Sequence, residues 1–294
     1  MTHFRGRAAD RAWQHLPGTA GGAAVDSSFE HALNLRVPGG LLTLVTRDGR
    51  PAPGVLITDA ATLPRVAAGT TARREGSTLE IGRLTVGLTG CTFFSCRVAR
   101  LPAATATAGS PRTRARQALD ALAAPGSFRT GTHAQDFEQA MSRRLTHGAQ
   151  TYRGAIGAAL TGDPDGLTPA AAALIGLGTG LTPSGDDYLV GALAVLTLHP
   201  ATSTLRRLLA HAVTVKADTT TPVGGHYLRA AADRCFHHDI TRAARCAVTG
   251  SDDLEAPSRR SPRSARPRGP TRSPASSTPW TPSPRHISET RKLT

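Results

Sequence analysis

Two adjacent aspartates beside a glycine-rich run are the residues of this chain best suited to chemistry. Asp186 and Asp187 follow GLGTGLTPSG, residues 176–185, which also contains the hydroxyl groups of Thr182 and Ser184. Paired carboxylates can transfer protons, accept amide N–H groups or ligate a divalent cation. Glycines allow a backbone to approach a ligand closely. This segment is therefore the candidate functional site.

The same segment is expected to begin a helix. Thr182 and Pro183 precede an apolar run, as Thr168 and Pro169 do fourteen residues earlier. In each pair the threonine can cap the helix while the proline takes the first helical position, where its missing N–H costs nothing. In a second register Ser184 is the cap and a carboxylate follows three positions later, as in a capping box. Both registers are open from the sequence.

An anion site at this helix start requires a particular ligand. Gly176, Gly178 and Gly180 would form a flexible loop, and free N–H groups of the first helical turn would point outward as an anion cradle. A bare phosphate would be repelled by Asp186 and Asp187. A divalent cation such as Mg²⁺ removes that conflict, and so does a ligand with N–H donors at one end and an anion at the other. Carbamoyl and amide compounds fit the second description. The alternative is that the segment has no binding function and is an ordinary loop before a capped helix.

The first part of the chain has the pattern of short strands. Within residues 28–100, apolar runs such as LNLRV, LLTLVT, GVLIT, STLEIGRLTVGL and CTFFSCRV alternate with turn residues. Turns at 38–40 and 47–49 favour antiparallel hairpins. Residues 1–110 are therefore predicted to be a β-rich part, and residues 102–111 have the composition of a linker.

The pattern beyond this linker is helical. Apolar residues recur at helical spacing in segments 113–125, 133–145, 205–215, 225–236 and 240–248. We therefore predict an α+β chain with a β-rich N-terminal part and a mainly α-helical C-terminal part. The helical part spans 111–256 and contains the glycine–aspartate loop, and a disordered basic tail spans 257–294.

The formal charge of +14 is concentrated in this tail. Residues 257–294 contain nine arginines and lysines against Glu289 alone, together with many prolines and serines. Such a composition buries too little apolar surface to offset the entropy of ordering, so disorder is expected. The tail is either a basic arm that contacts phosphates or a frameshift product, since from Ser264 the preceding frame is compatible with an apolar peptide containing TSGTD. The coding DNA decides between these hypotheses.

Other features narrow the class of protein. No apolar run reaches the length of a membrane span and the N-terminus lacks the apolar core of a signal peptide, so a soluble, cytoplasmic protein is expected. The four cysteines lack CxxC spacing and are expected to be small buried hydrophobic residues. His237 and His238 would point about 100° apart on a helix, which favours a helix end at the surface over a metal site.

The run GLGTGLTPSGDDYLVG resembles the signature of the AllH-like family, which includes a subunit of the bacterial oxamate carbamoyltransferase. SSFEHALNL at 27–35 and TTTPVGGHYLRAAADRCF at 219–236 are similar to other family segments. The resemblance implies a part in carbamoyl transfer: the phosphorolysis of carbamoyl-oxamate to oxamate and carbamoyl phosphate in allantoin and purine breakdown. It also implies partners, because that enzyme is a complex of several different subunits.

The resemblance assigns site residues by position. Gly178, Gly180, Thr182, Ser184, Gly185, Asp186 and Asp187 fall on the family motif, and Thr220, Thr221 and His226 fall on the later segment. The two aspartates are expected to be catalytic, by holding the carbamoyl NH₂ or a metal, and the other residues to bind substrate. The family also has a serine near Gly224 and a late glycine–serine–aspartate segment, both missing here. The alternatives are a non-catalytic scaffold subunit and a nucleic-acid-binding protein that uses its basic tail.

Overall fold

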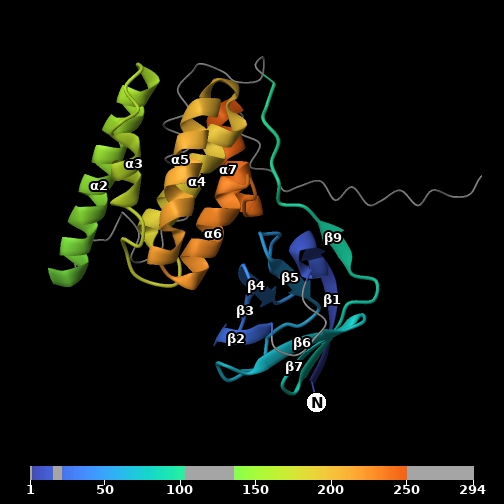
Figure 1. Cartoon of the computed structure of the whole chain (residues 1–294). Coiled ribbons are helices and arrows are strands. Elements are labelled where there is room, and N and C mark those ends of the chain that lie inside the picture. Colours follow the sequence, from blue (N-terminus) through green and yellow to red (C-terminus); the bar gives the residue numbers. More distant parts are fainter. Residues whose placement is uncertain (1, 16–21, 103–135, 250–294) are drawn as a thin grey trace, which may run out of the picture. The chain divides into compact units, whose positions relative to one another are not determined.

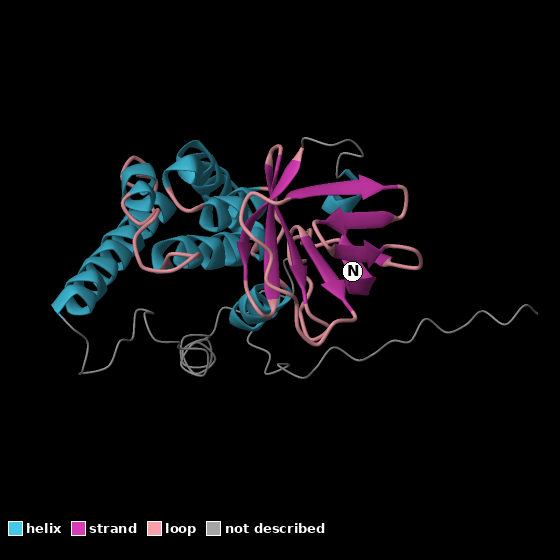
Figure 2. Ribbon diagram, turned by 90° about the horizontal axis from the view of Figure 1, so that it is seen from below, coloured by secondary structure: helices cyan, strands magenta, loops and turns pink. Residues whose placement is uncertain are grey.

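The computed structural model describes residues 2–15, 22–102 and 136–249. Within these ranges the strands belong to the N-terminal part and the helices to the C-terminal part (Figure 1, Figure 2), which confirms the predicted α+β class. The predicted helix at 113–125, almost all of the linker and the basic tail lie outside the described residues, as does the boundary at 110–111.

The described strands form one sheet that closes on itself. They are β1 (Thr2–Asp10), β2 (Ala23–Ser28), β3 (Ala32–Val37), β4 (Gly40–Val45), β5 (Val55–Thr58), β6 (Thr71–Glu75), β7 (Thr78–Ile81), β8 (Leu84–Gly87) and β9 (Thr92–Phe94), with the 3₁₀ helix η1 (Arg11–His15) after β1. Their order is β5-β4-β3-β2-β6-β7-β8-β1-β9, and a further antiparallel pairing of β5 with β1 closes the sheet.

One of the two predicted hairpins is confirmed. β3 and β4 pair antiparallel across the turn at 38–40, where Gly39 has a φ of 84°. β4 and β5 pair in parallel, so the predicted hairpin at 47–49 is wrong. The turn itself forms, because Gly49 N donates to Thr46 O at 2.9 Å, but the chain continues to residue 54 before β5 begins. This longer connection returns the chain to the end of the sheet from which β4 started.

The helical part contains four of the segments predicted from helical spacing and the two helices expected at the threonine–proline pairs. Its elements are α2 (Asp136–Leu160), α3 (Leu167–Ala172), α4 (Ser184–Leu198), η3 (Pro200–Thr202), α5 (Ser203–Lys216), η4 (Ala217–Thr219), α6 (Pro222–Ala232) and α7 (His238–Thr249). The predicted segments 133–145, 205–215, 225–236 and 240–248 correspond to α2, α5, α6 and α7. α4 packs against α5, α6 and α7 (Figure 1). No helix in the described ranges is long and apolar enough to cross a bilayer.

Two separate hydrophobic cores stabilise the two parts. The core of the sheet contains Trp13, Leu33 and Leu44, and the helical core contains Leu174 and Leu189, all nearly inaccessible to solvent. Full burial of each such side chain contributes about 1.5–3 kcal/mol. A third, small cluster formed by Ala52, Val55 and Ile57 packs against Tyr227 of α6. Through this cluster the middle of α6 packs against the sheet.

Candidate functional site

The glycine-rich loop is folded tightly against the start of α4. Its glycines have left-handed φ values of 73° at Gly176, 131° at Gly178 and 93° at Gly180. A Cβ on Gly178 would lie 2.5 Å from Ser184 N, and one on Gly185 would lie 1.9 Å from Leu174 O. Side chains are therefore excluded here by the protein's own backbone. Close packing requires glycine at Gly178 and Gly185, and a left-handed backbone favours it at Gly176 and Gly180.

α4 begins at Ser184 without a side-chain cap, so both predicted capping registers are wrong. Pro183 occupies the cap position with an extended ψ of 140°, and Gly185 N donates to Leu177 O at 2.8 Å. The Leu177 carbonyl of the loop thus accepts the N–H hydrogen bond that a capping hydroxyl would otherwise accept. The same prediction for the earlier pair is also wrong, because α3 begins after Gly166 and Thr168 lies inside it.

The first-turn N–H groups of α4 already have acceptors within the protein. Asp186 N and Asp187 N both donate to Pro183 O, at 2.9 and 3.1 Å, and Gly185 N bonds the loop carbonyl. The prediction that these three amides point outward as an anion cradle is therefore wrong. The physical reason is the tight turn at Pro183, whose carbonyl points along the new helix.

Asp186 is buried and held from two sides. The residue is 1% exposed, and its Oδ1 accepts from Gly176 N at 2.8 Å while its Oδ2 accepts from Thr220 Oγ1 at 2.5 Å. Burial raises the pKa of this carboxyl, and the bonds from Thr220 and Gly176 lower it. A Cβ on Gly224 would lie 2.3 Å from Oδ2. A cation between the two aspartates would compete with these donors, which disfavours the Mg²⁺ alternative at Asp186.

Asp187 has a different environment from its neighbour. Its side chain is exposed, yet protein atoms crowd it on the inner side and desolvation raises its pKa to about 6. A hydrogen bond with the Thr182 hydroxyl lowers the pKa and the charge of Asp186 raises it. Solvent access limits the shift, so its upward direction matters more than its size. A solvent-accessible carboxyl with a raised pKa is a candidate acid or base.

The hydroxyls of Thr220 and Thr221 are both engaged in the structure. Thr221 caps α6: its Oγ1 accepts from Gly224 N at 2.9 Å and donates to Leu181 O, and Pro222 follows at the first helical position. The threonine–proline start signal therefore operates here rather than at α4. Thr220 donates to Asp186. Two predicted substrate-binding residues and one predicted catalytic residue are thus brought together.

A pocket of about 410 Å³ adjoins these threonines. Its lining includes Arg36 of β3, Gly39 of the following turn and Gly40 at the start of β4. Asp218, Thr220 and Thr221, which lead into α6, and Arg229 within α6 complete this group. Asp186, Asp187 and the glycine-rich loop do not line it. Of the predicted site residues, Thr220 and Thr221 are therefore the ones that contribute to this pocket.

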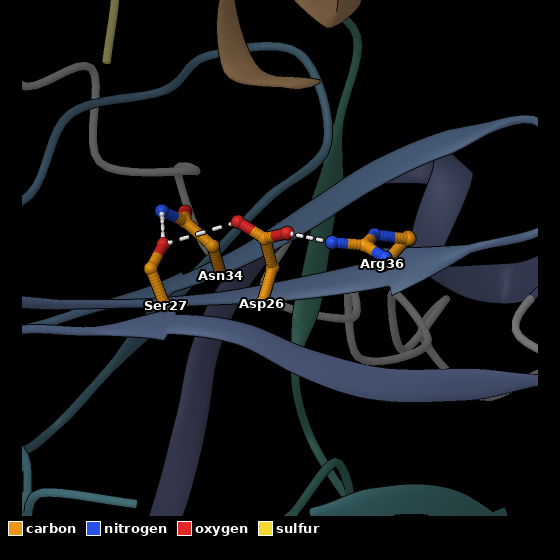
Figure 3. Close-up of polar contacts among 4 residues, drawn as sticks. All are labelled: Asp26, Ser27, Asn34 and Arg36. Carbon is orange, nitrogen blue, oxygen red and sulfur yellow. Dashed lines mark hydrogen bonds and ion pairs between the residues drawn. The ribbon is translucent and has the colours of Figure 1, made fainter. Parts of the chain in front are cut away.

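Carboxylates on nearby elements orient the two pocket arginines, which sequence reasoning missed. Arg36 pairs with Asp26 on β2, where Ser27 Oγ lies 3.3 Å from Asp26 Oδ2 and accepts from Asn34 Nδ2 at 2.9 Å (Figure 3). Arg229 pairs with Asp218. The one local signal for Arg36 is its place next to the Pro-Gly-Gly turn, since such turns often carry binding residues.

His226 connects α6 to the sheet with both ring nitrogens. Its Nδ1 accepts from Leu41 N at 3.4 Å, and its Nε2 lies 3.1 Å from Pro53 O, to which it donates in the matching tautomer. A Cβ on Gly40 or Gly54 would approach the ring to 3.3 or 3.1 Å. Burial lowers the pKa of this histidine. The geometry gives His226 a positional role, outside the lining of the pocket.

The remaining histidines and cysteines form no cluster in the described part of the chain. α7 begins at His238, and Asp239 N donates to His237 Nδ1 at 3.1 Å, which confirms the predicted helix end, but both histidines are half-buried rather than at the surface. Cys96 is buried, and Cys91, Cys235 and Cys246 are half-buried and free. No group of three or more His, Cys, Asp or Glu residues in the described ranges could hold a metal ion.

Comparisons with known proteins cover both parts of the chain. A family model described as AllH family N-terminal domain matches residues 6–93, and one described as oxamate carbamoyltransferase subunit AllH matches residues 174–261. The second match includes the glycine–aspartate loop, Thr220 and the whole of α6. Searches of the curated proteins and of the solved structures return no match.

Proposed function

Because the chain belongs to the AllH family, we propose that it contributes a substrate pocket to an oxamate carbamoyltransferase-like complex. The family description names one subunit, which implies that other subunits complete the enzyme. The proposed reaction is carbamoyl transfer between a carbamoylated amide or acid and phosphate, within cytoplasmic allantoin breakdown. The observation that supports a substrate-binding role is the pocket between Arg36 and Arg229, with Thr220 in its lining.

The pocket offers groups for both ends of such a substrate. Guanidinium groups bind carboxylate or phosphate oxygens with two parallel hydrogen bonds, so Arg36 and Arg229 suit the acid end. Thr220 uses its only proton in the bond to Asp186, which leaves oxygen lone pairs that accept N–H groups. Carbamoyl and amide groups provide N–H donors. Arg36 and Arg229 thus take over anion binding, which the sequence pattern predicted for the backbone amides at the start of α4.

The transfer itself breaks one bond and forms another. A phosphate oxygen attacks the carbamoyl carbon, the bond from that carbon to the oxamate nitrogen breaks, and the nitrogen takes a proton. We assign the proton to Asp187, because its raised pKa keeps more of the carboxyl protonated near neutrality than in an ordinary aspartate. Asp187 lies outside the lining of the pocket, so this assignment requires the carbamoyl end of the substrate to extend beyond the pocket toward α4. Asp186 acts as a positioning residue through Thr220. The other motif residues, Gly178, Gly180, Thr182, Ser184, Gly185, Thr221 and His226, would shape the surroundings.

Turnover in the assembled complex tests this proposal. Asp187→Asn should abolish carbamoyl phosphate formation, Arg36→Gln should raise KM for the carbamoylated acid, and Thr220→Val should lower turnover. Asp165→Asn, at an exposed aspartate outside the lining of the pocket, is the matched control. Gel filtration with the partner subunits shows whether each variant still assembles. Full turnover in the assembled Asp187→Asn and Thr220→Val complexes would rule out a catalytic site in this subunit.

A scaffold role is the second candidate, and Leu181 favours it. This apolar side chain lies between Gly180 and Thr182 in the family motif and is 41% exposed. An exposed leucine in a tightly held loop is a natural contact for another subunit. If Leu181→Ser abolishes assembly while the pocket variants keep full turnover, the motif serves assembly rather than chemistry.

A further inference from the structure

Two arginines meet where the chain after β9 crosses the end of α6. Arg97 lies opposite Cys235 in an antiparallel bridge, and Val98 N donates to Arg234 O at 2.8 Å. Arg97 and Arg234 are therefore adjacent in space although they belong to distant segments. Neither residue lines the pocket described above.

Two more arginines lie nearby, Arg206 at the end of α6 and Arg100 beside the end of α4. Arg206 of α5 donates from its guanidinium to Ala232 O, the last residue of α6, and from Nε to Thr197 Oγ1 at 3.3 Å. The next residue of α4, Leu198, accepts from Leu101 N at 3.0 Å, which places Arg100 beside it. Arg97, Arg100, Arg206 and Arg234 together are called the arginine cluster.

The charge of the arginine cluster is not neutralised by the described residues. No carboxylate in the described ranges lies within 4.0 Å of any of the four guanidinium groups. Burial lowers the pKa of Arg206, as do Arg234, Arg100 and Arg97, and Asp233 raises it. The C-terminal ends of α4 and α6 each supply about half a negative charge. That is far less than four positive charges.

Arg234 has a backbone conformation that disfavours its own side chain. Its φ is 65°, and it is the non-glycine residue of the described ranges with a left-handed φ. Arg234 N donates to Ala231 O at 3.0 Å and Cys235 N to Ala230 O at 2.8 Å, a helix ending at which glycine is preferred. An arginine at this position adds a positive charge beside three others where glycine would be the unstrained choice.

We propose that the arginine cluster binds a phosphate group or another compact, multiply charged oxyanion. Four arginines near the ends of α4 and α6 match such an anion, since each guanidinium group can bind two of its oxygens. A nucleic acid would instead need a basic surface that follows its backbone over several phosphates. The site is separate from the pocket between Arg36 and Arg229.

Calorimetric titration of the full chain with pyrophosphate at constant ionic strength tests the proposal. Arg97→Gln and Arg100→Gln should each weaken binding about three- to tenfold, by removing a charge-assisted contact. Arg207→Gln, at the exposed arginine next to Arg206, is the matched control and should bind like the wild type. Arg234→Gly should weaken binding while raising the melting temperature, because glycine relieves the left-handed backbone. If Arg234 had only a structural role, Arg234→Gly would not weaken pyrophosphate binding while raising the melting temperature.

Further titrations identify the source of the anion. Binding of pyrophosphate or inorganic phosphate indicates free phosphate, and stronger binding of AMP indicates a phosphate ester. The proposal is overturned if Arg97→Gln and Arg207→Gln bind equally, or if only Arg36→Gln loses binding. It is also overturned if neither phosphate nor AMP binds, or if an oligonucleotide binds and pyrophosphate does not.

Discussion

Thr220 donates its hydroxyl proton to the buried carboxylate of Asp186 at 2.5 Å, across 34 residues of sequence. This bond connects the pocket lining to the start of α4, because Thr220 lines the pocket and Asp186 lies in the first turn of that helix. Hydrogen bonds to charged groups contribute about 1.5–3 kcal/mol to stability. The family motif and the later threonine segment are thus two halves of one hydrogen-bonded unit.

Loss of this bond should destabilise the fold. Thr220→Val keeps the shape of the side chain but leaves Asp186 with Gly176 N as its remaining partner, so the free energy of unfolding should fall by about 2 kcal/mol. Urea denaturation measures the change. Thr214→Val, which removes an exposed helical hydroxyl bonded to Ala210 O, should change stability by less than about 0.5 kcal/mol. Equal effects of the two substitutions would contradict this account.

Gly224 should tolerate no side chain because of Asp186. A methyl group there would lie 2.3 Å from Asp186 Oδ2, so Gly224→Ala should cost at least about 1–3 kcal/mol. Gly191 is also helical, but a Cβ there would have no atom within 4 Å. Gly191→Ala should therefore stabilise α4 by about 0.5–1 kcal/mol. Thermal unfolding of both variants would refute the packing argument if the two shifts had the same sign.

Asp187 should make the protein less stable as the pH rises from about 4 to about 6. Its pKa is raised to about 6 in the folded state, mainly by desolvation, so the folded protein holds this proton more tightly than the unfolded chain. That advantage is complete at low pH and is lost as the carboxyl ionises. Asp187→Asn cannot ionise, and its stability relative to the wild type should be higher at pH 7 than at pH 4.5. A difference that is the same at both values would show that the pKa is not raised.

His226 should produce the opposite pH dependence. Its pKa is lowered from 6.5 by burial and by the charge of Arg229, so the folded protein favours the neutral ring. Stability is then complete above pH 6.5 and is lost as the pH falls toward the lower folded-state pKa. His226→Gln should be less stable at pH 7.5 but lose less stability between pH 7.5 and 5.5. The exposed His211→Gln serves as control, and an unchanged pH profile in His226→Gln would contradict the prediction.

Strands were predictable where apolar residues alternate and not where pairing alone imposes the strand. LNLRV and LLTLVT became β3 and β4 because their leucines fill the core of the sheet. β1 and β6 have the sequences THFRGRAAD and TARRE, which carry little apolar periodicity. β1 acquires its form from pairing with β5, β8 and β9, and β6 from pairing with β7 and β2.

The residues of the site were predictable in part, for a related reason. A local pattern brings out Asp186 and the threonines, but Thr182–Pro183 and Thr221–Pro222 look alike, and only the second pair caps a helix. The difference is the carbonyl of Leu177, which the folded loop places at α4. For Arg36 the only local signal is its place next to the Pro-Gly-Gly turn, and its position near α6 becomes visible only when the sheet forms.

The closed sheet also restricts how other subunits can join this one. Among the strands of the described ranges, β9 alone has a single neighbour. β5, which is at the other end of the strand order, has β4 on one side and β1 on the other. β9 is three residues long and carries Phe93 at 42% exposure. A partner could extend this sheet by backbone augmentation only along that short edge. Quaternary assembly of the family complex must otherwise rely on contacts between side chains.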